Sequence, residues 1–229
     1  MNQISIAIDG PSGAGKSTLA RQAAQRLGFV YVDTGANYRT VALYCLRSGV
    51  SAEDLSCVPA LLPQIQVDID YSSDGVQRMM LNGTDVSEEI RLPEISMFTS
   101  VVSALPEVRQ FLLEKQRELA RTHDVIMDGR DIGTVVLPDA TVKIYLTAAA
   151  EARAQRRCAE LRQKGIDVSF DEVLRDVQER DYNDTHRAIS PLKQADDARV
   201  LDTTCLNLGE SLDVLVRLIQ EGLPDAQRG

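Results

Sequence analysis

Residues 4–32, ISIAIDGPSGAGKSTLARQAAQRLGFVYV, decide the fold of this chain of 229 residues. An apolar run from Ile4 to Ile8 leads into a glycine-rich turn, after which apolar side chains recur at helical spacing until Gly28. A second apolar run, Phe29 to Val32, follows directly. A strand, a helix and a strand in this order predict a parallel pair joined by a right-handed crossover.

Further apolar runs extend this unit along the chain. They cover Val125–Met127, Val142–Leu146 and Val200–Leu201, and helical patterns separate them. Buried parallel strands are apolar throughout because helices cover both faces of their sheet. The sequence therefore predicts an α/β fold in which a five-stranded parallel sheet is covered by helices.

One segment, residues 65–86, departs from this pattern, because apolar and polar residues alternate in it. Ser72 to Gly75 is typical of a turn, and Asn82-Gly83 is a signal of a tight hairpin. We expect a small antiparallel sheet inserted into the α/β chain. The pattern alone leaves open whether this insert covers an edge of the protein or forms a substrate-binding subdomain.

The second half of the chain carries clear helix signals. Ala150 to Lys164 has a helical pattern that Gly165 ends, and Ser169 and Glu172 have the spacing of a capping box for the next helix. Ser211 to Glu221 predicts a last helix before a polar tail.

The composition excludes several classes of function. The chain has 25 Lys and Arg against 34 Asp and Glu, and its net charge of −9 argues against a nucleic-acid polymer or an anionic membrane as the main partner. No segment approaches the roughly 20 apolar residues that span a bilayer, and the N-terminus lacks the pattern of a signal peptide. The sequence has only two His and no Trp, and so few histidines argue against a His-based metal site or a Ser-His-Asp triad.

The four cysteines, Cys45, Cys57, Cys158 and Cys205, lie far apart and form no CxxC pair. Their spacing predicts buried thiols in a reducing compartment rather than disulfides or metal ligands. A chain of this length buries enough surface to hold a core without disulfides. We therefore expect a cytoplasmic protein.

The strongest motif is Gly10-Pro-Ser-Gly-Ala-Gly-Lys-Ser17, which fits G-x-x-x-x-G-K-[ST] and lies between a strand and a helix. Its glycines let successive backbone N–H groups converge on phosphate oxygens, and the helix N-terminus adds the positive end of its dipole. Lys16 is expected to reach the β- and γ-phosphates of ATP, and Ser17 to bind Mg²⁺ through its hydroxyl. The predicted ATP-binding residues of this loop are Gly10, Pro11, Ser12, Gly13, Ala14, Gly15, Lys16, Ser17 and Thr18.

The motif alone does not identify the phosphate acceptor. The sequence contains no N-K-x-D guanine-binding motif and no LSGGQ-type signature, which leaves a small-molecule kinase as the interpretation. Polar clusters follow two of the predicted strands, at Asp33–Arg39 and at Asp128–Gly133. Because ligands bind at the carboxyl ends of the strands in open α/β sheets, we expect the second substrate there.

At these residues the chain resembles the bacterial cytidylate kinases of the nucleoside monophosphate kinase family, and the resemblance runs almost from end to end. It includes IDGPSGAGKST, VDTGANYR, the antiparallel insert with Asp85-Val86-Ser87 and Glu89-Ile90-Arg91, DGRDIGTVVLPDA, Glu179-Arg180-Asp181 and Leu201-Asp202-Thr203-Thr204. This resemblance favours the substrate-binding role of the insert. The chain departs from the family at Asn37, where Met or Ile is frequent, and at Glu88, where Gly is frequent.

The resemblance implies a P-loop kinase that transfers a phosphoryl group from ATP to CMP or dCMP, giving CDP or dCDP, with Mg²⁺ as cofactor, in pyrimidine nucleotide metabolism. Such a transfer depends on positioning and charge neutralisation and needs no strong general base. Two alternatives remain: a kinase for another monophosphate such as UMP, and a nucleotide-binding regulator without catalysis. The insert and the lid are expected to close over the substrates and exclude water, and the protein to be a monomer.

The resemblance also implies roles for individual residues. Those implied to bind CMP are Thr34, Arg39, Ser100, Arg109, Arg130, Asp131, Arg180, Asp184 and Arg187, and those implied to be catalytic are Lys16, Arg130 and Arg187. The cytosine base would be bound by Ser100, Arg109 and Asp131. The ribose would be bound by Arg180 and Asp184, which are spaced to share one helix face with Arg187 at the transferring phosphate.

Two further assignments are less complete. Asp128 would either hold Mg²⁺ through a water or cap the loop, and the sequence leaves both open. Arg153, Arg156 and Arg157 share a helix face at the mouth of the lid, where only Arg157 is assigned to ATP because a solvated face is an alternative.

We expect residues 1–229 to form a single P-loop kinase domain. Its core would comprise residues 1–36, 104–150 and 188–229. The monophosphate-binding insert would cover about 37–103 and the short helical lid about 151–187.

Overall fold

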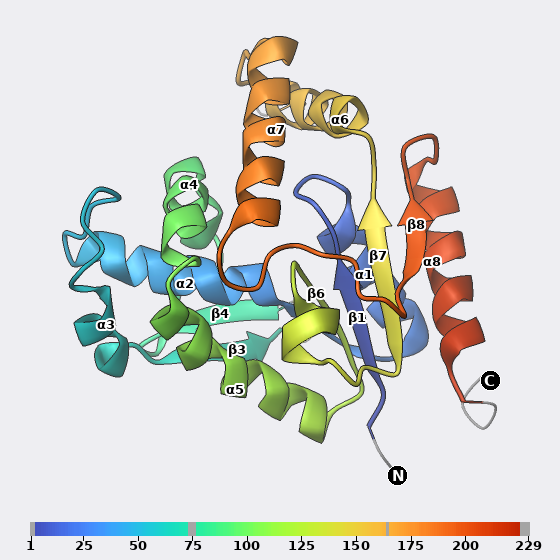
Figure 1. Ribbon diagram of the computed structural model, residues 1–229, viewed down its shortest axis with the longest axis horizontal. Helices are drawn as coiled ribbons and strands as arrows, with labels where there is room; N and C mark the ends of the chain where they lie inside the picture. The colour runs from blue at the N-terminus through green and yellow to red at the C-terminus, as the bar shows by residue number, and fades with distance from the viewer. Residues whose placement is uncertain (1–2, 73–76, 164, 225–229) are drawn as a thin grey trace. The chain divides into compact units, whose positions relative to one another are not determined.

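The computed structural model describes residues 3–72, 77–163 and 165–224 (Figure 1). The chain divides into two compact units. Unit 1 comprises Met1–Tyr31 and His123–Gly229, and unit 2 comprises Val32–Thr122.

A five-stranded parallel sheet forms the centre of unit 1. Its strands follow the order β2 (Val30–Asp33), β6 (Val125–Gly129), β1 (Ser5–Asp9), β7 (Val142–Thr147) and β8 (Arg199–Asp202), and β2 continues into unit 2 at Val32. The central strand β1 pairs with β6 on one side and with β7 on the other, and all five residues of β6 are buried. Because the inner strands are enclosed on both faces, they are apolar along most of their length, as predicted.

Two helices share the core of unit 1 with these strands. α1 (Lys16–Leu27) and α8 (Leu208–Gly222) pack on each other, and Leu19 and Leu215 lie in one cluster with Ile8, Ile144 and Leu146 of the sheet. α1 ends at Gly28, whose φ of 73° is the left-handed conformation that suits glycine. The predicted strand–helix–strand unit is therefore present, but the predicted pairing of its two strands is wrong, because β6 lies between β1 and β2 in the sheet.

A pair of packed helices, α6 (Ala150–Gln163) and α7 (Phe170–His186), lies beyond the carboxyl end of β7 (Figure 1). Ala154 and Cys158 of α6 pack against Val173 of α7 in a small apolar cluster of their own. The predicted capping box at the start of α7 is present, since the Ser169 and Glu172 side chains each accept a backbone N–H of the other. This α6–α7 pair occupies the segment predicted as the lid.

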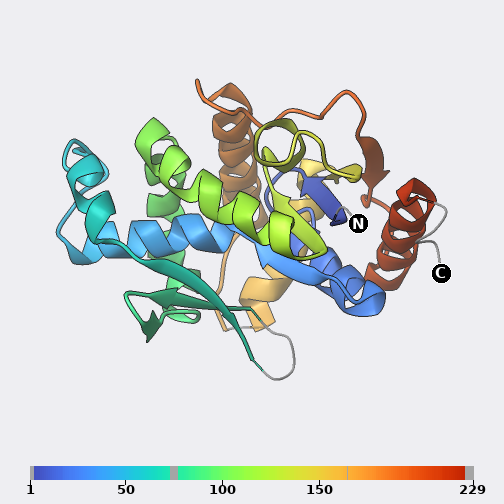
Figure 2. The ribbon, with the colours of Figure 1, turned by 90° about the horizontal axis from the view of Figure 1, so that it is seen from below.

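Unit 2 contains a three-stranded antiparallel sheet beside helices (Figure 2). Its elements are α2 (Thr34–Arg47), α3 (Val58–Leu61), the 3₁₀ turn Leu62–Gln64, β3 (Val67–Tyr71), β4 (Gln77–Leu81), β5 (Thr84–Asp85), the 3₁₀ turn Glu89–Arg91, α4 (Pro93–Val102) and α5 (Pro106–Thr122). The hairpin from β4 to β5 turns at Asn82 and Gly83, which have φ values of 49° and 81° as a tight hairpin requires. The predicted Ser72–Gly75 turn lies mostly outside the described residues.

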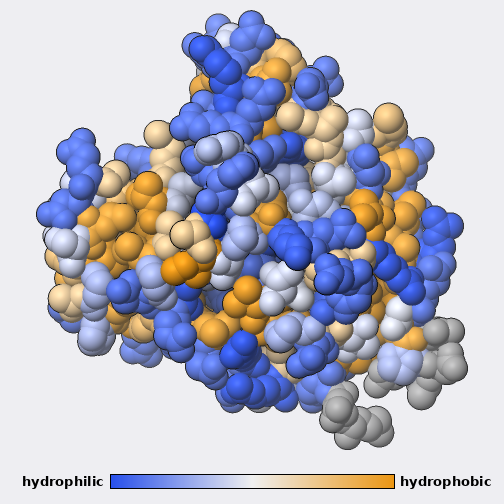
Figure 3. All heavy atoms as spheres, in the orientation of Figure 1, coloured by the Kyte–Doolittle hydropathy of each residue, from blue (hydrophilic) through white to orange (hydrophobic). Residues whose placement is uncertain are grey.

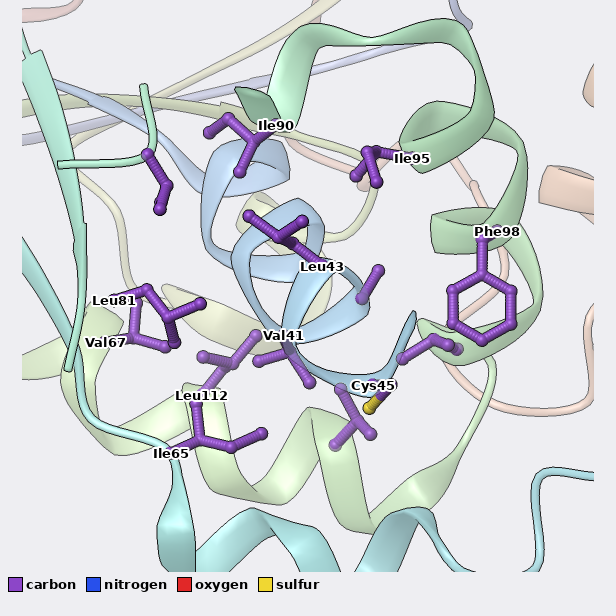
Figure 4. Close-up of a cluster of buried hydrophobic side chains, with 14 of the residues drawn as sticks. Val41, Leu43, Cys45, Ile65, Val67, Leu81, Ile90, Ile95, Phe98 and Leu112 are labelled. Atoms are coloured by element: carbon purple, nitrogen blue, oxygen red, sulfur yellow. The ribbon is translucent and has the colours of Figure 1, made fainter. Parts of the chain in front are cut away.

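The core of unit 2 surrounds α2. Val41 and Leu43 of α2 pack with Val67 and Leu81 of the antiparallel sheet and with Leu112 of α5 (Figure 4). Since α5 contributes to this core, it belongs to unit 2 by packing. The sequence-based boundaries of core, insert and lid stay a prediction.

The predicted fold class is confirmed by the two sheets, one parallel and one antiparallel. The prediction of four buried cysteines is wrong for two of them. Cys45 and Cys158 are buried within helices, but Cys57 and Cys205 are exposed, because one precedes a short surface helix and the other lies in the loop after β8. Over the described ranges, no helix is both long and apolar enough to cross a bilayer.

Candidate functional site

The glycine-rich loop between β1 and α1 is shaped by close backbone approaches. At Gly10, with φ of 155°, an added Cβ would lie 1.9 Å from the Leu146 carbonyl oxygen, so no other residue fits there. Gly15, with φ of 91°, precedes α1 at its N-cap and offers no side-chain cap to the first N–H groups of the helix. The loop therefore leads into a helix N-terminus that suits an anionic phosphate.

Lys16 is buried at the start of α1, and its Nζ donates a hydrogen bond to the Pro11 carbonyl oxygen across the loop at 2.8 Å. Burial, reinforced by the positive charge of Arg130, lowers the pKa of Lys16 to about 7. The carboxylates of Asp128, Asp184 and Asp9 act in the opposite direction. An anion that binds beside Lys16 would raise this pKa and favour the charged ammonium form.

Ser17 and Asp128 lie together beside this lysine. The Ser17 hydroxyl donates to Asp128 Oδ2 at 2.8 Å, and the Tyr31 hydroxyl donates to Asp128 Oδ1 at 2.9 Å. A hydroxyl and a carboxylate oxygen in one place are the hard oxygen ligands that Mg²⁺ prefers, and Mg²⁺ keeps most of its remaining positions for phosphate and water. No cluster of three or more His, Cys, Asp or Glu suited to a metal occurs in the described part of the chain.

Asp9, at the end of β1, has a structural role that sequence reasoning missed. Its Oδ1 accepts the Ile132 N–H at 2.8 Å and its Oδ2 accepts the Gly133 N–H at 2.7 Å. The two bonds hold the start of the π-helical turn Ile132–Val136, whose N-cap is Asp131. Burial raises the pKa of Asp9 to about 6, although both backbone bonds act against that rise. The only sequence signal was an acid that ends a buried strand directly before the glycine-rich loop.

Arg130 follows β6 and pairs with Asp184 of α7, with the Arg130 Nε donating to Asp184 Oδ2 at 2.6 Å. Burial alone would raise the pKa of Asp184, but the positive charges of Arg130, Arg180 and Arg187 outweigh burial and lower it. Asp184 is therefore ionised at neutral pH. The predicted residues Arg130, Arg180, Asp184 and Arg187 thus lie within one electrostatic cluster of unit 1.

Arg187 lies next to the predicted base-binding Asp131, with 3.8 Å between its Nη2 and Asp131 Oδ1. Its Nε donates to the Ser190 carbonyl oxygen at 2.5 Å. The prediction that Arg187 shares a helix face with Arg180 and Asp184 is wrong in detail, because α7 ends at His186 and Arg187 has extended backbone angles. A loop, rather than the helix, orients this side chain.

The three arginines of α6 have different surroundings. Arg157 is half exposed and pairs with Glu160 one turn later at 3.2 Å. Arg153 is buried and Arg156 is partly buried, and both donate hydrogen bonds to other segments of unit 1. The exposed face of the α6–α7 pair is mainly hydrophilic (Figure 3). The assignment of Arg157 to ATP stays a prediction.

In unit 2, the start of α2 brings Thr34 and Arg39 close to Asp33. Asp33 caps α2 by accepting the Ala36 N–H at 2.9 Å through Oδ1, and its Oδ2 accepts from Arg39 Nη2 at 2.7 Å. Gln77 of β4 accepts the Asp33 N–H at 2.8 Å, which fixes the helix start against the antiparallel sheet. Asp33 thus orients Arg39, a role that the sequence cluster alone did not assign.

The predicted base-binding residues of unit 2 come from neighbouring helices. Arg109 of α5 lies over the Tyr38 ring of α2, with its Cζ 5.5 Å from the ring centroid, and its Nη1 donates to the Ser103 carbonyl oxygen at 3.0 Å. Ser100 is one turn before Ser103, and its carbonyl oxygen accepts from the Ser103 hydroxyl at 3.3 Å. The α4–α5 connection therefore holds Arg109 in a fixed orientation.

Comparison with known proteins identifies the family of this chain. The family model of cytidylate kinase matches residues 6–221. The cytidylate kinase of Carboxydothermus hydrogenoformans is 50% identical over 214 residues, which cover 93% of this chain and 96% of that protein. The cytidylate kinase of Syntrophotalea carbinolica is 48% identical over 219 residues, with coverage of 96% and 93%.

A solved structure of low sequence identity has a similar fold. An uncharacterized protein from Eubacterium ventriosum has a TM-score of 0.53 at 12% identity, and the match covers 96% of this chain and 99% of that one. The family match extends over nearly the whole chain and includes both units. The chain belongs to the cytidylate kinase family.

Proposed function

We propose that this protein transfers the γ-phosphoryl group of ATP to CMP and dCMP, giving ADP with CDP or dCDP, and that Mg²⁺ assists the transfer. The observation that carries the proposal is the cluster of Lys16, Ser17 and Asp128 with Arg130 in unit 1 of a cytidylate kinase family member. A monomeric state and a cytoplasmic location remain sequence-based parts of this proposal.

The glycine-rich loop and the start of α1 would bind the ATP phosphates. Lys16 would exchange its hydrogen bond to the Pro11 carbonyl oxygen for phosphate oxygens, and the Ser17 hydroxyl and Asp128 would hold Mg²⁺. When bound, Mg²⁺ neutralises charge on the phosphates. Asp128 accepts from both Ser17 and Tyr31, which orients its carboxylate for either direct or water-mediated binding.

Each proposed phosphate-binding arginine lies beside a carboxylate of its own unit. Arg39 pairs with Asp33, Arg130 pairs with Asp184, and Arg187 lies 3.8 Å from Asp131. Among the described residues, the buried Arg39 Nε has no hydrogen-bond partner, so it is available to an incoming phosphate. A planar guanidinium fixed in this way binds phosphate through paired hydrogen bonds.

The base and the sugar of CMP would be bound by polar groups of matching hydrogen-bonding type. Cytosine presents an amino donor beside two acceptors, so a carboxylate such as Asp131 suits the donor, and Ser100 or Arg109 suits the acceptors. Arg180 and Asp184 would bind the ribose. These assignments rest on the family resemblance and on the orientation of Arg109 by Tyr38 and Ser103.

Phosphoryl transfer of this kind needs no covalent intermediate with the protein. The CMP phosphate oxygen is itself the nucleophile, which agrees with the scarcity of histidine, and the attack is in line with the departing ADP. Lys16, Arg130 and Arg187 would offset negative charge as it moves toward the leaving group. Exclusion of water would protect ATP from hydrolysis.

A coupled assay of ADP release across CMP, dCMP, UMP and AMP at matched concentrations tests this proposal. We expect CMP and dCMP to be the best acceptors, and Lys16→Ala to abolish turnover while the fold survives. If UMP or AMP were the better acceptor, the assignment of CMP and dCMP as substrates would be wrong. ATP binding without turnover of any acceptor would identify a regulator instead.

A further inference from the structure

Arg153, near the start of α6, is a buried arginine that the proposed phosphoryl transfer does not use. Its Nε donates to the Ala148 carbonyl oxygen at 2.9 Å. Its Nη1 donates to the Ser12 carbonyl oxygen at 3.0 Å and to Asp181 Oδ1 at 2.9 Å, and its Nη2 completes the ion pair at Asp181 Oδ2. One guanidinium, with only 4% of its side chain exposed, therefore joins the glycine-rich loop, the segment after β7 and α7.

A second arginine of α6 is also linked to this loop. Arg153 itself lies close to Gly13, since a Cβ built onto that glycine would be 3.5 Å from the Cβ of Arg153. One turn later, Arg156 donates to the carbonyl oxygen and to the hydroxyl of Thr203. The Thr203 hydroxyl in turn donates to the Ala14 carbonyl oxygen at 3.4 Å. Arg153 thus binds the loop directly at Ser12, and Arg156 is linked to the loop through Thr203.

The geometry of Arg153 differs from that of an arginine that waits for a phosphate. Its guanidinium already donates to three acceptor groups, one of them a carboxylate in a two-pronged pair. A phosphate ligand would have to displace the Asp181 carboxylate from a guanidinium that is almost fully buried. Lysine could not replace this arginine, because it lacks the planar fork.

We infer that Arg153 is a positioning residue that fixes α7 relative to the glycine-rich loop and thereby keeps Asp184 beside Arg130 and Arg187 beside Asp131. The inference rests on the proposed function, because the residues positioned are those assigned to the transfer.

The path from Arg153 to these residues is short. Asp181 is three residues before Asp184 on α7, so the two carboxylates lie on one side of the helix, one turn apart. A shift of α7 toward or away from the loop would move Asp184 and the Arg130 side chain that it holds. Displacements of about 1 Å at reacting groups reduce rates by up to about a hundredfold.

The test compares Arg153→Lys, Asp181→Asn and the double variant, each shown by circular dichroism to be folded at the assay temperature. We expect each single variant to lower kcat about ten- to a hundredfold with little change in KM for ATP. The double variant should be no slower than the slower single variant, because both changes break the same pair.

The matched control is the pair of Arg26 in α1 and Asp213 in α8, which also joins two helices of unit 1 but is exposed. Arg26→Lys and Asp213→Asn should leave kcat unchanged, since a solvated ion pair contributes little. A rise in KM for ATP in Arg153→Lys, with normal kcat in Asp181→Asn, would show that Arg153 binds phosphate directly and would overturn the inference. Loss of thermal stability with unchanged kcat would also overturn it.

Failure of the proposed function can be distinguished from failure of this inference. If the wild-type protein phosphorylates no CMP, the proposed function fails, and hydrogen exchange then decides the inference without any acceptor. With ADP and Mg²⁺ as the probe, backbone amides of α7 should become protected in the wild type and less so in Arg153→Lys. Equal protection in the two proteins would contradict the positioning role.

Discussion

Lys16 depends for its charge on what binds beside it. Burial, together with the positive charge of Arg130, lowers its pKa to about 7, so a fraction of the free protein carries a neutral lysine at neutral pH. A polyphosphate would restore the charge by raising that pKa. Binding of ATP should therefore take up a proton above neutral pH.

Proton uptake at Lys16 can be measured by calorimetric titration with ATP in buffers of different ionisation enthalpy. We expect uptake that approaches one proton per ATP as the pH rises from about 6 to about 9, with ATP affinity falling by at most about tenfold per pH unit. Lys16→Arg is the control, because its guanidinium stays charged throughout this range. Absence of uptake in the wild type would contradict the lowered pKa.

Asp9 should make stability depend on pH in the opposite direction from an ordinary carboxylate. Burial raises its pKa in the folded state to about 6, so folding favours the protonated form. Its contribution is therefore present below its unfolded pKa and is lost as the pH rises through about 6. Urea unfolding should show that the unfolding free energy of the wild type, minus that of Asp9→Asn, falls by on the order of 2 kcal/mol between about pH 4 and 7. A constant difference would contradict this prediction.

Gly35 lies beside the arginine assigned to the acceptor phosphate. A Cβ at this position would lie 3.1 Å from Arg39 Nη1 and 3.2 Å from Asp33 Oδ1, although the helical backbone itself would accept alanine. Gly35→Ala should therefore displace Arg39 and raise KM for CMP, despite the gain of up to about 1 kcal/mol that alanine gives a helix. Steady-state kinetics with varied CMP check this outcome.

The control for Gly35 is Gly209→Ala in the first turn of α8, where the nearest atom to the added Cβ is Asn207 Oδ1 at 3.4 Å. This variant should leave KM for CMP unchanged. If Gly35→Ala also leaves KM unchanged, Arg39 does not bind the acceptor phosphate in the orientation that Asp33 imposes.

Among individual residues, those of the glycine-rich motif could be predicted, whereas Asp9 and Arg153, which hold the surrounding loops, could not. Lys16 and Ser17 belong to a motif with fixed local spacing. Asp9 acts on Ile132 and Gly133 more than 100 positions away, and Arg153 binds the Ser12 carbonyl oxygen across 141 positions. Neither contact has a sequence pattern, because folding alone brings the partners together.

Among the elements, the start of α7 is the clearest local stabilising feature. Ser169 accepts the Glu172 N–H at 3.2 Å, and the Glu172 carboxylate accepts the Ser169 N–H at 3.3 Å. Ser169→Ala should lower the unfolding free energy by about 1 kcal/mol and increase hydrogen exchange in the first turn of α7. Asn207→Ala, at the matching box of α8, should instead affect α8. Faster exchange in both helices from either change would contradict independent caps.

The order of strands and helices followed from hydrophobic periodicity, since buried strands, hairpin and capping signals are local. Boundaries were less accurate. The second strand is Val30–Asp33 rather than residues 29–32, and α7 stops one residue before Arg187. The strand is bounded where it pairs with β6, whereas at the end of α7 a local hydrogen bond holds Arg187, whose Nε donates to the Ser190 carbonyl oxygen.

For the molecule as a whole, the acidic composition and the basic site are compatible. The net charge is −9, yet Arg39, Arg130 and Arg187 are each placed beside an acid within their own unit. The two units also have separate apolar cores, one around α1 and α8 and the other around α2. Net charge therefore describes the chain as a whole, while side-chain pairing describes the surroundings of the individual arginines.

If these arginines bind phosphate, their pairing with carboxylates would set a threshold for anion binding. A weakly charged anion that approaches Arg39 competes with Asp33, and one that approaches Arg130 competes with Asp184. A phosphate monoester brings two negative charges and several acceptor oxygens, so it can engage donors that the carboxylate leaves unused. Chloride or a single carboxylate brings only one negative charge and would compete less well with the resident acid. The resting ion pairs would thus discriminate, by charge density, against the small anions of the surrounding solution.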